Sequence, residues 1–262
     1  MTEWNVASAA QHLLDAEAEQ RDITPITDEW AELDVETAYR VQDEVIRLKQ
    51  AEGHTVTGVK LGLTSRAKQQ RMGISSPLTA VITDAMVLGA GVPVPLDELI
   101  HPRIEPEIVF VMGRELKGPG VTAAAAMAAV ETVHAGFEVI DSRFKDFKFT
   151  LPDVIADNAS SARYIVSARG FDPEGLDLAL EAVLVRVNGS VIDTATGAAV
   201  QGHPGEALAL AANSLAERGR SIPAGALVLT GGLTDAVFVN PGDQISAEFT
   251  TLGTIVTAGS AA

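Results

Sequence analysis

The 262-residue sequence contains no cysteine, which excludes disulfide bonds, a thiolate zinc site and a cysteine nucleophile. Positive charge is also scarce, because 19 Lys and Arg stand against 35 Asp and Glu, a formal net charge of −16 at pH 7. Such a surface repels phosphate backbones and anionic lipid, so we expect neither nucleic acid nor a membrane as a partner. An acidic substrate would need a local positive centre, and a bound divalent cation is the obvious candidate.

Long apolar runs are absent too. No run approaches the roughly 20 residues of a membrane-spanning helix, and the alanine-rich run 121–130 opens into Glu131. The N-terminus is acidic and amphipathic, without the basic start and apolar core of a signal peptide, so we expect a cytoplasmic protein. What remains, 47% hydrophobic and 21% charged residues, is typical of a globular protein.

Hydrophobic periodicity predicts two helices near the N-terminus, at residues 7–19 and 37–51. After Gly53 the pattern changes to strands, which predicts a helical part over residues 1–55 and a β-rich catalytic part over 56–262. The predicted strands cover residues 56–61, 81–88, 107–112, 136–140, 182–187, 190–194, 226–230 and 244–257, the last folding at Leu252-Gly253. Further helices are predicted at 64–73, 121–134 and 204–218. The fold class is therefore α+β.

The most informative motif is Glu105-Pro106-Glu107. Residues two apart on an extended segment point to the same face, so this spacing places two carboxylates side by side. Two such carboxylates repel each other unless a cation lies between them. A lone Glu-x-Glu is more often a solvated strand face, so the motif needs a second observation.

Glu138 provides that observation, because it lies in the apolar stretch AGFEVI at 135–140. A carboxylate inside an apolar strand needs a basic residue or a metal, since burying an unpaired charge is costly. Carboxylate oxygens suit Mg²⁺, with Mn²⁺ as a substitute, far better than zinc or copper. Our hypothesis is that Glu105, Glu107 and Glu138 hold Mg²⁺.

Lys60 interrupts the apolar run VTGVKLGL at 56–63, where a lysine is unexpected unless it meets an anion. A structural salt bridge to an interior acid explains it as well as a catalytic role does. Arg103 and Arg143 have the geometry to bind carboxylates bidentately, but each is equally compatible with a surface charge. The weaker candidates for substrate binding are Arg143, Asn158, Ser160, Ser161 and Gly232. Turn formation explains the 157–161 string equally well.

Taken together, five motifs resemble the fumarylacetoacetate hydrolase superfamily. They are VKLGLTS at 59–65, PRIEPEI at 102–108, FEVIDSR at 137–143, ADNAS at 156–160 and LTGG at 229–232. They occur in the expected order over nearly the whole chain. The resemblance implies a mixed β-roll with a small helical N-terminal part, metal carboxylates at Glu105, Glu107 and Glu138, and an active-site lysine at Lys60.

Within the superfamily, the match is to the branch of 2-hydroxypentadienoate hydratases and 4-oxalocrotonate decarboxylases of aromatic meta-cleavage pathways. The segments 142–153 and 231–235 resemble the decarboxylases. The resemblance therefore implies Mg²⁺-dependent decarboxylation of 2-oxo-3-hexenedioate. A hydratase, or a non-catalytic partner of an enzyme complex, is the alternative. Three aromatic residues would line a dry pocket or belong to the core: Phe144, Phe147 and Phe149.

The partner that this branch implies is a small 2-oxo dicarboxylic acid. A homo-oligomer is expected, and a complex with a related hydratase is a further arrangement that the branch allows.

Overall fold

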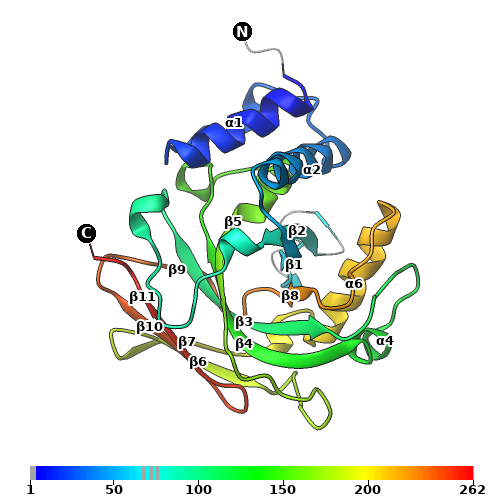
Figure 1. Cartoon of the computed structure of the whole chain (residues 1–262), viewed down its shortest axis with the longest axis vertical. Helices are drawn as coiled ribbons and strands as arrows, with labels where there is room; N and C mark the ends of the chain where they lie inside the picture. Colours follow the sequence, from blue (N-terminus) through cyan, green and yellow to red (C-terminus); the bar gives the residue numbers. More distant parts are fainter. Residues whose placement is uncertain (1–3, 67–68, 71–72, 75–76, 262) are drawn as a thin grey trace.

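The computed structural model describes residues 4–66, 69–70, 73–74 and 77–261 (Figure 1). Within these residues, one sheet contains β1 (Val56–Gly62), β2 (Leu78–Thr83), β3 (Arg103–Met112), β4 (Val130–Ile140), β5 (Ser161–Val166), β8 (Leu227–Leu229) and β9 (Val237–Phe238). Its order is β2-β1-β8-β3-β4-β5, and β9 also pairs with β3. The second sheet contains β6 (Ala182–Val187), β7 (Ser190–Thr196), β10 (Gln244–Phe249) and β11 (Gly253–Ala258), in the order β11-β10-β6-β7.

The helices lie around the sheets, with α1 and α2 stacked at one end (Figure 1) and α6 beside β1 and β2. The α-helices are α1 (Val6–Ala18), α2 (Val35–Ala51), α4 (Ala123–Met127), α5 (Leu151–Ala156) and α6 (Pro204–Glu217). The described residues also include six single turns of 3₁₀ helix: η1 (Ile26–Asp28), η2 (Asp84–Met86), η3 (Leu96–Glu98), η4 (Lys145–Phe147), η5 (Asn158–Ser160) and η6 (Gly197–Ala199). The α+β class with mixed sheets is as predicted.

The two N-terminal helices form where side-chain caps and apolar periodicity coincide. Asn5 accepts from the backbone N–H of Ser8 and Asp34 from that of Thr37, which satisfies donors at each helix start. Their apolar faces share one buried cluster with Phe144 and Ile155 of the β-rich part. The N-terminal helices therefore contribute to a core that the rest of the chain completes. The division of the chain into two parts at residue 55 stays a prediction.

The two hairpins of the second sheet form where the sequence predicts them. Asn188 and Gly189 have positive φ angles of 51° and 80°, as a type I′ turn requires, and they join β6 to β7. The predicted turn near Leu252-Gly253 joins β10 to β11. Both hairpins are confirmed, as is the helix predicted at 204–218.

Other predicted elements were wrong. The helix expected over 121–134 ends at Met127, and β4 begins at Val130. The alanines favour helix, but pairing with β3 along ten residues of β4 overrides that preference. The strand expected over 81–88 is shifted, because β2 ends at Thr83 and Asp84 turns back to accept the N–H of Thr55. The helix predicted at 64–73 includes residues outside the described ranges.

Candidate metal centre

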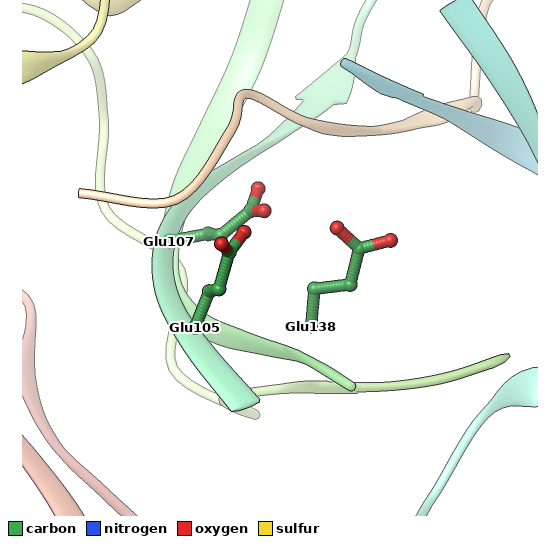
Figure 2. A group of neighbouring side chains, drawn as sticks. All are labelled: Glu105, Glu107 and Glu138. Carbon is green, nitrogen blue, oxygen red and sulfur yellow. The ribbon is translucent and has the colours of Figure 1, made fainter. Parts of the chain in front are cut away.

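Three glutamates meet on the face of two neighbouring strands. Glu105 and Glu107 are two residues apart on β3 and share a face, while Glu138 lies directly opposite Glu105 in the register of β3 and β4. One carboxylate oxygen from each residue lies within 4.8 Å of the others. Figure 2 shows the three carboxylates pointing toward one another. Strand periodicity and register together therefore build the cluster.

The cluster is electrostatically unfavourable without a cation. Burial, followed by the charges of Glu138 and Glu105, raises the pKa of Glu107 well above its ordinary value. Burial also raises the pKa of Glu138, although Lys60 opposes the shift. Glu107 Oε2 accepts the N–H of Gly231 at 2.8 Å, but Oε1 is buried and has no hydrogen-bond donor in the described part of the chain. This orphaned oxygen and the all-oxygen donor set fit Mg²⁺.

Lys60 of β1 faces the cluster. Its Nζ lies 3.0 Å from Glu138 Oε2 and donates to the carbonyl of Ala159 at 2.8 Å. The Lys60 side chain is 4% exposed and that of Glu138 1%. The Ser161 hydroxyl donates to the other Glu138 oxygen at 3.0 Å. The sequence did not decide whether Lys60 forms a structural salt bridge or has a catalytic role. The geometry is compatible with both, because Lys60 pairs with Glu138 and also lines the cavity.

A left-handed turn positions the carbonyl that holds Lys60. Asn158, Ala159 and Ser160 have φ angles of 48°, 50° and 59°, a conformation that costs free energy for L-residues. The Asn158 side chain compensates by bridging β2, accepting from the N–H of Val81 at 2.9 Å and donating to its carbonyl at 2.8 Å. Strain of this kind persists where surrounding contacts fix it.

The Gly231-Gly232 loop completes the wall of the site. A Cβ on Gly232 would lie 2.5 Å from Glu105 Oε2, and a Cβ on Gly231 would collide with the Thr64 side chain. Gly231 also has a φ of 112°, which L-residues with a side chain rarely adopt. These two glycines allow the backbone to approach both Glu105 and Glu107.

A cavity of about 520 Å³ opens in front of the cluster. The residues of interest in its wall are Lys60, Arg103, Glu105, Phe147, Phe149 and Gly232. Ser160 also reaches the wall. Phe144, by contrast, is fully buried in the N-terminal cluster, so two of the three phenylalanines face the cavity and one belongs to the core.

Two of the weaker candidates lie away from this cavity. Arg143 is buried, forms an ion pair with Asp157 through Nε, and donates from Nη1 and Nη2 to the carbonyls of Asp141 and Asp157. The side-chain amide of Asn158 hydrogen-bonds to the backbone of β2. These polar groups already have structural partners, and substrate contact by Arg143 or Asn158 stays a prediction.

Arg103 is the wall residue that sequence reasoning left undecided. It lies two residues before Glu105 and lines the same cavity. The alternation that pairs Glu105 with Glu107 extends one step back to Arg103. The prediction began β3 at residue 107, so this step fell outside the expected strand.

Comparison with known proteins identifies the family to which this chain belongs. Residues 48–258 match the family model described as Fumarylacetoacetate (FAA) hydrolase C-terminal. The chain belongs to the fumarylacetoacetate hydrolase family. It is 43% identical over 250 residues to 4-oxalocrotonate decarboxylase of Pseudomonas putida, covering 95% of each chain. It is 38% identical over 251 residues to 2-hydroxyhexa-2,4-dienoate hydratase of Comamonas testosteroni, again covering 95% of each.

Among solved structures, the fold is similar to that of 4-oxalocrotonate decarboxylase from Pseudomonas putida G7 complexed with magnesium and adipate. The TM-score is 0.95 and the identity 41%, over 99% of this chain and 98% of the other. The α+β family fold predicted from the sequence is thereby confirmed. Among the described residues, the helices are too short or too polar to cross a membrane.

Proposed function

We propose that this protein catalyses the Mg²⁺-dependent decarboxylation of 2-oxo-3-hexenedioate to 2-hydroxypenta-2,4-dienoate and CO₂, a reaction of aromatic meta-cleavage catabolism. The observation that carries the proposal is a cluster of three carboxylates at the edge of a cavity, whose wall includes Glu105 and the Lys60 that pairs with Glu138. The full-length likeness to 4-oxalocrotonate decarboxylase, including a structure complexed with magnesium and adipate, supports the choice of reaction.

Glu105, Glu107 and Glu138 would hold the metal. Bound Mg²⁺ supplies a Lewis acid that stabilises negative charge on the 2-oxo oxygen of the substrate. The chain's own residues prepare the site: Gly231 orients the Glu107 carboxylate through its N–H, and Ser161 orients Glu138. Lys60 adds a fixed positive charge at the cavity edge.

The reaction requires that the bond to the distal carboxylate breaks and that its electron pair moves through the conjugated double bond onto the 2-oxo oxygen. CO₂ leaves, and one proton taken up by that oxygen gives the 2-hydroxydienoate. Lys60 would stabilise the developing charge and donate this proton. Phe147 and Phe149 give the cavity apolar walls, which strengthen such charge interactions by excluding water.

The proposed partner is a small 2-oxo dicarboxylic acid. A homo-oligomer and a complex with a related hydratase remain part of the proposal. The 38% identical hydratase relative supports the second arrangement only. The cytoplasm is the proposed location.

Product analysis tests the proposal. The protein is expressed alone, so that no hydratase copurifies, and is incubated with 2-oxo-3-hexenedioate and Mg²⁺. We expect CO₂ and 2-hydroxypentadienoate, and little 4-hydroxy-2-oxopentanoate when 2-hydroxypentadienoate is supplied directly. Rapid hydration without CO₂ would instead identify a hydratase.

Lys60→Met provides a second arm of the test. Because this change removes the charge beside Glu138 while keeping an apolar stem, we expect turnover to fall by roughly a hundredfold or more, with the fold retained by circular dichroism. Turnover at the full rate would reduce Lys60 to a structural ion pair.

A further inference from the structure

Arg103 continues the line of functional side chains along β3. It precedes Glu105 by two residues and lies on the same strand face. Consecutive residues rise by about 3.4 Å, so the Cα atoms of Arg103 and Glu105 are separated by about 7 Å. That step is comparable to the separation of the two carboxyl carbons in an extended six-carbon diacid. Both side chains line the 520 Å³ cavity.

Two aromatic rings fix the plane of the Arg103 guanidinium. Its Cζ lies 4.1 Å from the ring centre of Phe147 and 4.2 Å from that of Phe238. Phe147 comes from η4 and Phe238 from β9, which pairs with β3 at Arg103. A guanidinium held between two ring faces keeps its N–H groups directed outward in its own plane, where a carboxylate binds bidentately.

The guanidinium has no anionic partner within the described part of the chain. Its Nε is buried without a hydrogen-bond acceptor, and no carboxylate of the described residues forms an ion pair with it, in contrast to the paired Arg143 and Arg163. A buried donor without an acceptor is costly, so the site is arranged for an acceptor that arrives from outside.

We infer that Arg103 binds the distal carboxylate of the substrate, the group that leaves as CO₂, and thereby selects 2-oxo dicarboxylic acids over 2-oxo monocarboxylic acids. The inference rests on the proposed function. The carboxylate accepts hydrogen bonds from the guanidinium edge while the 2-oxo acid end occupies the metal centre. A monocarboxylic acid leaves the buried Nε of Arg103 without an acceptor, which is the kind of loss from which enzymes derive strong discrimination.

The same contact is consistent with the chemistry. The guanidinium keeps its protons throughout, and the carbon–carbon bond breaks with its electron pair moving into the conjugated chain. The product CO₂ is neutral and no longer forms a charge-assisted hydrogen bond with Arg103. Arg103 therefore holds the reactant in place but does not retain the product.

Calorimetry on the Mg²⁺-loaded protein tests this assignment with two unreactive acids. 2-Oxohexanedioate has both carboxylates, whereas 2-oxohexanoate lacks the distal one, and neither has the double bond that decarboxylation requires. Wild type should prefer the diacid by roughly ten- to a hundredfold, as a charge-assisted hydrogen bond implies. Arg103→Gln should lose this preference while binding 2-oxohexanoate as wild type does, and Arg103→Lys should keep part of it.

The matched control is Arg186→Gln. It removes an arginine of β6 that pairs with Glu248 of β10, both in the second sheet and away from the cavity, and should leave both affinities unchanged. Undiminished binding of 2-oxohexanoate shows that Arg103→Gln is folded with its metal centre intact. A retained preference for the diacid in Arg103→Gln would overturn the inference alone. Binding of neither acid by wild type would overturn the proposed function as well.

Discussion

At the scale of single residues, the site depends on carboxylates whose burial works against their charge. Because burial raises the pKa of Glu107, this carboxyl group holds a proton in the metal-free protein at a pH where an exposed glutamate is ionised. Mg²⁺ must displace that proton. Binding should therefore release protons, and the affinity for Mg²⁺ should rise with pH.

Calorimetric titrations at pH 6 and pH 8, each in two buffers of different ionisation enthalpy, measure both effects. We expect tighter binding at pH 8 and a heat that depends on the buffer at pH 6. Equal affinities and buffer-independent heats would mean that the three carboxylates are already ionised without metal.

Arg143 leads to a prediction about stability rather than about metal binding. It is buried with Asp157 and donates to two backbone carbonyls, so Arg143→Gln leaves an unpaired buried carboxylate. We expect a loss of about 3–5 kcal/mol in the free energy of unfolding, measured by urea denaturation. Arg163→Gln, at a partly exposed pair with Glu98, serves as the control and should cost about 1 kcal/mol or less.

Residue types and spacing were sufficient to predict that Glu105, Glu107 and Glu138 converge and that Lys60 faces an anion, because charged groups inside apolar strands are informative. They were insufficient for Arg143 and Asn158. A buried arginine paired with an aspartate and one bound to substrate present the same sequence, and only the fold shows that Asp157 lies within reach. The contact between Lys60 and the Ala159 carbonyl joins residues 99 positions apart, which no local pattern encodes.

At the scale of elements, the centre depends on how closely the loop after β8 approaches β3. Gly232→Ala places a Cβ 2.5 Å from Glu105 Oε2, the movable end of a side chain. The fold should tolerate the change, but Glu105 should shift and Mg²⁺ affinity should fall by roughly tenfold. Gly89→Ala, where a Cβ would lie 3.3 Å from Val92, is the control for added volume. Unchanged Mg²⁺ affinity in Gly232→Ala would show that the loop does not constrain Glu105.

Element prediction succeeded where local chemistry decides the structure. Asn188-Gly189 specifies its own turn, and α1 and α2 have capping residues at their starts. It failed for the first part of β4, where an alanine-rich helix gives way to a strand within three residues, and for β5 and α5, which were not predicted. Their conformation depends on partners distant in sequence, β3 for β4 and α2 for α5.

At the scale of the whole molecule, a chain of net charge −16 is proposed to bind a dianion. The general field should slow the approach of the substrate, whereas the metal and Arg103 act only at short range. Raising the salt concentration from about 0.02 M to 0.15 M shortens the Debye length to about 8 Å. We expect KM for 2-oxo-3-hexenedioate to fall severalfold over this range in steady-state assays with Mg²⁺ saturating. A KM that rises with salt would mean that local positive charge dominates the approach.

The central claim is that Mg²⁺ held by Glu105, Glu107 and Glu138 carries the decarboxylation. CO₂ release from 2-oxo-3-hexenedioate, measured against Mg²⁺ concentration after chelator treatment, tests it most directly. Wild type should release CO₂ only after Mg²⁺ is restored. Glu131→Gln, an exposed change on β4, should behave as wild type does. Glu107→Gln should require far more Mg²⁺ or remain inactive. Full CO₂ release by the chelated wild type, or a Glu107→Gln curve that overlays that of wild type, would contradict the account.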